Sequence, residues 1–213
     1  QVCYGNLNVK FGGAYCGMSD ALDGATHHAT EDIAVMRALP NMTVLVPSDA
    51  TSTRWATKYA VDTYGPMYLR LSRDVYPDLY DENTKFECGK GAIVRDGTDV
   101  TVIACGILVH KALEAAEQMA ARGVSVRVVD MYSIKPIDRD IIVKAAKETG
   151  RISTVEEHSV IGGLGSAVAD VLAARHPAKL VKIGVNDEFG HSGPAVDLLK
   201  EYGLCADNIV AKA

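Results

Sequence analysis

The densest cluster of side chains that could do chemistry is the segment 23–28, which reads Asp-Gly-Ala-Thr-His-His and precedes the first expected helix. A carboxylate at Asp23 and an imidazole at His27, four residues apart on one loop, could hydrogen-bond hydroxyl groups and move protons. In open α/β sheets, ligands collect at loops that lead into helix N-termini. Spacing alone nevertheless favours a simpler alternative, in which Asp23 caps the turn and both histidines are solvated.

A second candidate is the run Glu156-Glu157-His158, followed by glycines at 162, 163 and 165. Glycines between a strand and a helix allow a backbone to approach phosphate closely. In the dinucleotide-binding fingerprint, however, a third glycine would stand at position 168, which is Val168. We therefore predict that these glycines serve tight strand-to-helix packing.

Two further side chains have less context. Arg73 ends an expected strand, where its guanidinium could bind a phosphate or carboxylate through two hydrogen bonds. A surface salt bridge to the acidic segment that follows is an equally valid interpretation. His191 lies in a loop before the last expected helix with no nucleophile or base nearby, so a capping or interface role is predicted for it.

Composition excludes several classes of function. The 213 residues include 22 basic and 27 acidic side chains, a formal charge of −5, and no basic block, which disfavours a nucleic-acid or anionic-membrane partner. No apolar run approaches the roughly 20 residues that span a bilayer. The five cysteines are odd in number and scattered, which fits neither a disulfide scaffold nor a zinc site. A reduced, cytoplasmic setting is the simpler prediction, with no metal site.

The first 73 residues alternate between helix and strand patterns. Residues 30–39 have helical periodicity that Pro40 ends, 43–46 is a short apolar strand, Asp49 can cap a helix through Tyr59, and 67–71 is the next strand. This order predicts a βαβ unit with a parallel sheet. The strand-like residues 7–11 need neighbouring strands, and there is no initiator Met, so we expect a fragment or a processed chain.

Residues 74–88 are acidic and lack periodicity, which predicts an interdomain linker. Beyond it, Asp96-Gly97 predicts a hairpin in which strand 92–94 lies antiparallel to strand 100–104. Helices are expected at 108–122, 138–149, 164–175 and 194–202, and strands at 124–129, 151–155 and 180–185. The fold class is therefore α/β: a partial parallel-sheet domain, then a three-layer α/β/α domain with a mixed five-stranded sheet of four parallel strands and one antiparallel strand.

Taken in order, these segments resemble the C-terminal part of transketolase and its thiamine-diphosphate relatives. The motifs DGATH (23–27), ED (31–32), RALPNM (37–42), PSDA (47–50) and LSR (71–73) look like the second half of the pyrimidine-binding domain. The motifs VIACG (102–106), DMYSIKPID (130–138), TVEEH (154–158), GGLGSAV (162–168) and residues 184–193 are similar to the transketolase C-terminal domain. The resemblance implies a partial pyrimidine-binding domain at 1–73, a linker at 74–88 and a C-terminal domain at 89–213.

The resemblance implies transfer of a two-carbon ketol unit between sugar phosphates, with thiamine diphosphate as electron sink and Mg²⁺ in the full enzyme. By position, Asp23 and His27 match residues that hold the donor's hydroxyls, and Arg73 matches the one that binds its terminal phosphate. The segment from Glu156 to Gly165 is mainly structural in the family. The residues that hold cofactor and metal should lie upstream of Gln1, so this chain alone is expected to bind neither. An N-terminal section is the implied partner, within a homodimer.

This chain departs from the family pattern at two places. Ala21-Leu22 stands where the family usually has Gly-Glu, and Tyr15 stands where a phosphate-binding histidine is common. The identity of the sugar substrate therefore stays open. Two alternatives remain at this point: the β-type subunit of a 2-oxo acid dehydrogenase or a deoxyxylulose-phosphate synthase, and a non-catalytic dimerisation or docking module.

Overall fold

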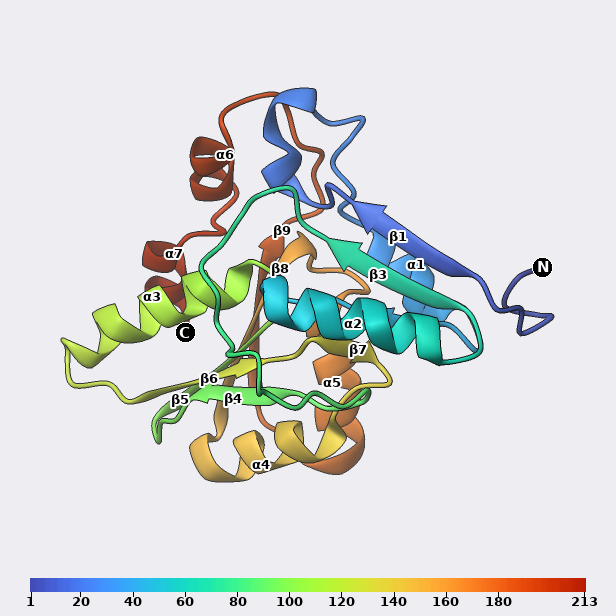
Figure 1. Cartoon of the computed structure of the whole chain (residues 1–213). Helices are drawn as coiled ribbons and strands as arrows, with labels where there is room; N and C mark the ends of the chain where they lie inside the picture. Colours follow the sequence, from blue (N-terminus) through green and yellow to red (C-terminus); the bar gives the residue numbers. More distant parts are fainter.

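The computed structural model describes residues 1–213, which form two sheets with helices around them (Figure 1). The first sheet has the strand order β1-β3-β2-β7. Its members are β1 (Lys10–Ala14), β2 (Thr43–Leu45), β3 (Met67–Leu71) and β7 (Ser133–Lys135). The strands β1, β3 and β2 are parallel, as the βαβ pattern predicts, and β7 pairs antiparallel with β2.

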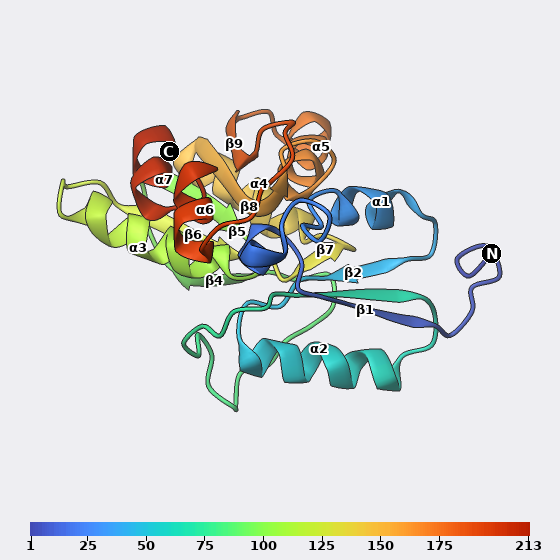
Figure 2. The same cartoon turned by 90° about the horizontal axis from the view of Figure 1, so that it is seen from above.

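The two faces of the first sheet bury different partners. Side chains alternate between the faces of a strand, so Leu45 and Met67 pack against α2 (Ala50–Asp62), while Val44 and Tyr68 pack toward α1 (Asp32–Ala38) and the second half of the chain. Figure 2 shows α2 on one side of these strands and α1 on the other. The first sheet is therefore covered on both faces, which explains its short, nearly continuous apolar strands.

The second sheet has the order β4-β6-β5-β8-β9. These strands are β4 (Ala92–Arg95), β5 (Val100–Ala104), β6 (Val126–Asp130), β8 (Arg151–Ser159) and β9 (Lys179–Val185). Four of them run parallel and β4 runs antiparallel to β6. The expected mixed five-stranded sheet is confirmed.

Helices cover both faces of the second sheet, which makes the three layers expected from the sequence. The helices α3 (Leu108–Ala120), α6 (Ala195–Glu201) and α7 (Ala206–Lys212) lie on one side, and α4 (Arg139–Thr149) and α5 (Leu164–Arg175) lie on the other (Figure 1). Buried Val102 faces the first group and buried Ile103 faces the second. The helix α7, at the end of the chain, is not anticipated in the sequence.

The predicted hairpin around Asp96-Gly97 is wrong. The strand β4 pairs with β6, and β5 lies on the far side of β6, because the central strand β5 has both its edges taken by β6 and β8. The turn instead crosses the start of β6, where a Cβ on Gly97 would lie 2.2 Å from the carbonyl carbon of Val126. The glycine thus permits a close crossing of two backbones rather than a two-residue hairpin turn.

The segment 74–88 contains no helix or strand, yet it is anchored to both halves of the chain. The N–H groups of Leu79 and Tyr80 each donate to the Asp49 carboxylate at 2.9 Å. The Tyr80 hydroxyl donates to buried Asp130 at 2.8 Å. No helix in the structure is both long enough and apolar enough to cross a bilayer, and all five cysteines are free thiols.

Candidate functional site

The structure brings Asp23 and Arg73 together at one edge of the first sheet. The strands β1 and β3 are parallel, so their carboxyl ends meet at that edge, where ligand-binding loops of α/β folds usually lie. Arg73 follows the end of β3, and the short helix η1 (Met18–Asp23) follows β1. The Arg73 Nη1 atom donates to Asp20 Oδ1 at 3.0 Å and to Asp23 Oδ2 at 3.2 Å.

The two carboxylates that hold Arg73 differ in burial. The side chain of Asp20 is 2% exposed, whereas those of Asp23 and Arg73 are 48% and 43% exposed. The Tyr15 ring lies beside the guanidinium, 5.2 Å from the Arg73 Cζ atom to the ring centroid, which is a cation–π contact. The hydrogen bond to Asp20 raises the pKa of Arg73, so the guanidinium stays charged. Part of it also remains exposed to solvent.

The two neighbouring histidines have different surroundings. His27 is exposed, and its Nδ1 atom lies 3.0 Å from the Thr26 hydroxyl, with no hydrogen bond to the side chain of Asp23 or Arg73. His28 is buried, and its Nε2 atom lies 3.3 Å from the Ala21 carbonyl. The simpler sequence interpretation is therefore wrong for His28, which is not solvated, and for Asp23, whose carboxylate binds Arg73.

The loop at 187–193 packs against the same site, which spacing does not predict. A Cβ on Gly24 would lie 2.6 Å from the Ser192 Oγ atom, and a Cβ on Gly190 would lie 2.2 Å from His28 Nδ1. Figure 2 shows this loop, between β9 and α6, beside η1. His191 itself is exposed and its Nε2 atom lies 3.1 Å from Glu201 on α6, so the predicted capping or interface role stays a prediction.

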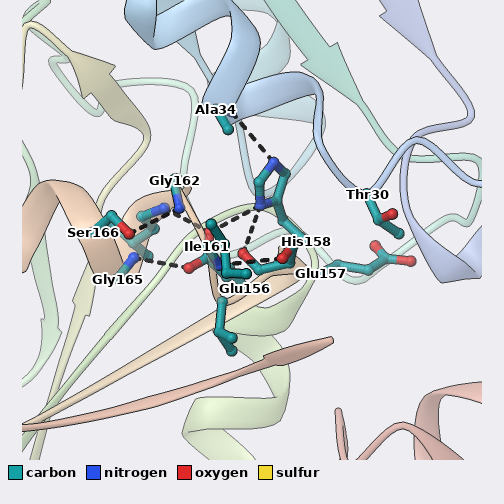
Figure 3. Close-up of polar contacts among 12 residues, drawn as sticks. Thr30, Ala34, Glu156, Glu157, His158, Ile161, Gly162, Gly165 and Ser166 are labelled. Atoms are coloured by element: carbon teal, nitrogen blue, oxygen red, sulfur yellow. Dashed lines mark hydrogen bonds and ion pairs between the residues drawn. The ribbon is translucent and has the colours of Figure 1, made fainter. Parts of the chain in front are cut away.

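The glycine-rich segment before α5 does not present a free helix N-terminus. The buried Glu156 carboxylate, on β8, accepts hydrogen bonds from the Leu164 N–H at 2.5 Å and the Gly165 N–H at 2.8 Å (Figure 3). A Cβ on Gly163 would lie 2.0 Å from Glu156 Oε2. The protein's own carboxylate thus fills the place where an anion would bind, and the packing role predicted for these glycines is confirmed.

Burial controls the charge of that carboxylate. Removal from solvent raises the pKa of Glu156 to about 7, against the opposing effect of the two helix N–H groups. The adjacent His158, which accepts a hydrogen bond from the Ala34 N–H at 3.3 Å, has its pKa lowered, also mainly by burial (Figure 3). Both groups join β8 to neighbouring elements rather than to solvent.

A buried polar network that the sequence did not predict joins β3 to α1, β8 and the start of η1. The Arg70 Nε atom donates to Asp32 at 2.8 Å, and its Nη2 atom donates to the Glu157 carbonyl at 2.9 Å. The Glu157 carboxylate accepts a short hydrogen bond from the Ser19 N–H, at the start of η1. A charged residue within the apolar strand 67–71 is the only sequence signal for this network.

Two features of this chain bear on the metal and the diphosphate that the family resemblance implies. No group of three or more His, Cys, Asp or Glu side chains is arranged to hold a metal ion. The one glycine-rich strand-to-helix turn is filled by Glu156. What the site does offer is a carboxylate, a guanidinium and an exposed imidazole, which suit hydroxyl and anion recognition.

Comparisons with known proteins place these features in a family. Residues 1–78 match the transketolase pyrimidine-binding domain and residues 89–209 match the transketolase C-terminal domain. The chain is 45% identical to a protein of Methanocaldococcus jannaschii named for a transketolase C-terminal section, over 99% of this chain and 67% of that protein. It is 41% identical to a 6-deoxy-6-sulfo-D-fructose transketolase subunit of a Clostridium species, over 100% of this chain and 66% of that one.

A solved structure agrees with these matches. It is a split-gene transketolase, described as an inactive β4 tetramer, which is 48% identical with a TM-score of 0.90, over 99% of this chain and 66% of that one. The chain thus spans about two thirds of the length of each of these three proteins. The resemblance in the motifs is confirmed on both halves of the chain, and it follows that the chain belongs to the transketolase family.

Proposed function

We propose that this chain is the C-terminal section of a transketolase that transfers a two-carbon ketol unit between sugar phosphates. The observation that carries the proposal is the meeting of Asp23 and Arg73, 3.2 Å apart, at the carboxyl edge of the first sheet. These are the positions that the family resemblance assigns to the donor sugar. A site for hydroxyls and an anion favours this proposal over a purely structural module.

Each side chain has a role that suits its chemistry. The Asp23 carboxylate accepts hydrogen bonds from hydroxyls of the donor sugar. The exposed His27 imidazole forms a hydrogen bond with a sugar hydroxyl or exchanges a proton with it. Arg73 binds the terminal anion of the donor, because a guanidinium offers several N–H donors and a fixed positive charge. Thiamine diphosphate, when bound in the whole enzyme, supplies the electron sink for cleavage of the carbon–carbon bond.

We propose a division of labour in which this chain binds the donor sugar and a partner section binds the cofactor and the metal. We propose a partial pyrimidine-binding domain at 1–73, a linker at 74–88 and a C-terminal domain at 89–213, a division that the extents of the two family matches support. Cofactor and Mg²⁺ are then held by an N-terminal partner section within a dimeric, cytoplasmic enzyme of the pentose phosphate pathway. Five free thiols suit a reducing compartment.

Reconstitution tests the proposal. The full-length protein that contains this chain is combined with its N-terminal transketolase section, thiamine diphosphate and Mg²⁺, and xylulose 5-phosphate with ribose 5-phosphate is compared with pyruvate. We expect a seven-carbon ketose phosphate and glyceraldehyde 3-phosphate from the sugars, and no reaction of pyruvate. Turnover of pyruvate alone would support the sister families instead. Saturable micromolar binding of the cofactor to the isolated chain in a calorimeter would contradict the proposed division of labour.

A further inference from the structure

The two side chains assigned to different parts of the donor are bound to each other in the structure. Arg73 Nη1 donates to Asp23 Oδ2 at 3.2 Å, which uses the carboxylate that a donor hydroxyl needs. All of the hydrogen bonds that Arg73 makes come from this one nitrogen, to Asp20 and Asp23. The Nε and Nη2 atoms make none, so they are available to an incoming anion.

The contacts around Arg73 divide into a strong one and a weak one. Asp20 is buried, and loss of its contact with Arg73 would leave its charge without a partner away from water. Asp20 therefore holds the guanidinium in place. The Tyr15 ring supports it from another side. The pair with Asp23 is about half exposed on both sides, and such pairs are weak because water competes with them. The contact with Asp23 is therefore the one that a ligand can break.

From this geometry, and resting on the function proposed above, we propose that Arg73 is a specificity-determining residue that keeps Asp23 occupied until a tetrahedral oxyanion binds. A terminal phosphate or sulfonate on the donor engages the free Nε and Nη2 donors and offsets the positive charge that attracts Asp23. The Asp23 carboxylate then turns to the donor hydroxyl. A neutral donor has to displace Arg73 from Asp23 without that help.

The proposal predicts effects of opposite sign for two donors that differ only in the phosphate. In the reconstituted holoenzyme, Arg73→Ala should raise the KM of xylulose 5-phosphate by about tenfold or more, since a charged hydrogen-bonding partner is lost. The same variant should lower the KM of unphosphorylated xylulose by about two- to fivefold, the range for release of a half-exposed ion pair. Arg175→Ala, which removes an exposed arginine at the end of α5, should change neither.

Inorganic phosphate provides a second test, which does not depend on a lower KM in a variant. Added phosphate should lower the KM of xylulose about two- to fivefold in the wild-type holoenzyme, and chloride at matched ionic strength should not. Arg73→Ala should abolish this response. An unchanged or raised KM for xylulose in Arg73→Ala, or no effect of phosphate on the wild type, would overturn the coupling while leaving transketolase activity intact. Failure of both sugars in the wild type would instead overturn the proposed function.

Discussion

At the residue scale, a buried ion pair joins β3 to the start of α1, and its cation, Arg70, lies outside the motifs that the sequence analysis names. Arg70 and Asp32 form an ion pair whose side chains are 6% and 12% exposed, and the Tyr68 hydroxyl donates to the same Asp32 oxygen at 2.7 Å. The exposed pair Arg37–Asp170 has a longer contact, 3.2 Å, and a carboxylate that is 77% exposed. Similar pairs at different depths therefore provide a matched comparison.

We expect Asp32→Ala to lower the free energy of unfolding by about 3–5 kcal/mol, because it leaves the Arg70 charge buried without a partner. Asp170→Ala should cost less than about 1 kcal/mol, since water replaces the lost carboxylate at the surface. Urea unfolding of both variants and the wild type measures the difference. Equal losses in the two variants would show that Arg70 finds another counter-charge.

The site residues were predictable only in part, for physical reasons. Asp23 and Arg73 stand out by type and by their motifs, but their contact joins positions 50 residues apart and depends on the pairing of β1 with β3. Spacing cannot predict that the Asp23 carboxylate is paired with a cation. Nor can it predict that Glu156 reaches from a strand to the start of the next helix.

At the element scale, α5 begins without a capping side chain at its own N-cap, Gly163. The cap comes from Glu156 on the preceding strand, and this arrangement requires the strand and the helix start to lie very close. A methyl group on Gly163 would lie 2.0 Å from Glu156 Oε2 and 2.6 Å from His158 Nδ1. The glycine is thus required by space rather than by its backbone angles.

Gly163→Ala should therefore destabilise the protein by about 1–3 kcal/mol, the usual cost of forcing an extra carbon into a packed region. Gly12→Ala is the control, because a Cβ at that position of β1 meets nothing within 4 Å. We expect a change below about 0.5 kcal/mol there. Thermal unfolding of the two variants distinguishes them, and a neutral Gly163→Ala would argue that β8 and α5 can separate.

Elements with clear start and stop signals were predicted well, and short ones were not. The sequence places α5 at its observed ends, 164 and 175, because the helical run begins after glycines and stops before a proline. The strand β7 has only three residues, Ser133–Lys135, and its partner β2 lies in the other half of the chain. Local patterns carry no information about such a distant pairing. The hairpin prediction failed for the same reason, because β4 pairs with β6 and not with the next strand in the chain.

At the scale of the whole molecule, buried carboxyl groups collect where the two halves of the chain meet. Asp130 accepts hydrogen bonds from Ser48 and Tyr80, each at 2.8 Å, and Glu157 contacts Ser19 through its carboxylate. Burial raises the pKa values of Asp130, Glu156 and Glu157 to about 7. These three carboxyl groups therefore make stability depend on pH near neutrality.

The sign of the resulting pH effect follows from proton linkage. The folded state binds these protons more tightly than the unfolded chain, so between about pH 4.5 and 7 it holds more of them. The stabilising contribution of these groups is complete below their unfolded pKa values and is lost as the pH rises through about 7. The lowered pKa of His158 acts in the opposite direction, so a comparison with a variant is needed.

We expect Glu157→Gln to remove part of the fall in unfolding free energy between pH 5 and 8, with each removed pKa unit worth about 1.4 kcal/mol. The neutral amide keeps an acceptor for the Ser19 N–H but has no proton to lose. The control Glu114→Gln changes an exposed carboxylate that pairs with Lys111 and should leave the slope unchanged. Urea titrations at four or five pH values provide the slopes, and parallel curves for wild type and Glu157→Gln would refute the assignment.

The pairing of β7 with β2 constrains how relatives of this protein can be recombined. A chimaera joined within residues 74–88 would take its first sheet from one parent and the edge strand of that sheet from the other. Besides the strand pairing, the Lys135 ammonium donates to the Arg37 carbonyl at 2.9 Å, across the same seam. Breakpoints that keep paired strands in one parent therefore differ from those suggested by the linear order of the domains. A hybrid enzyme built at the linker would inherit a mismatched edge strand unless 133–135 travelled with the N-terminal parent.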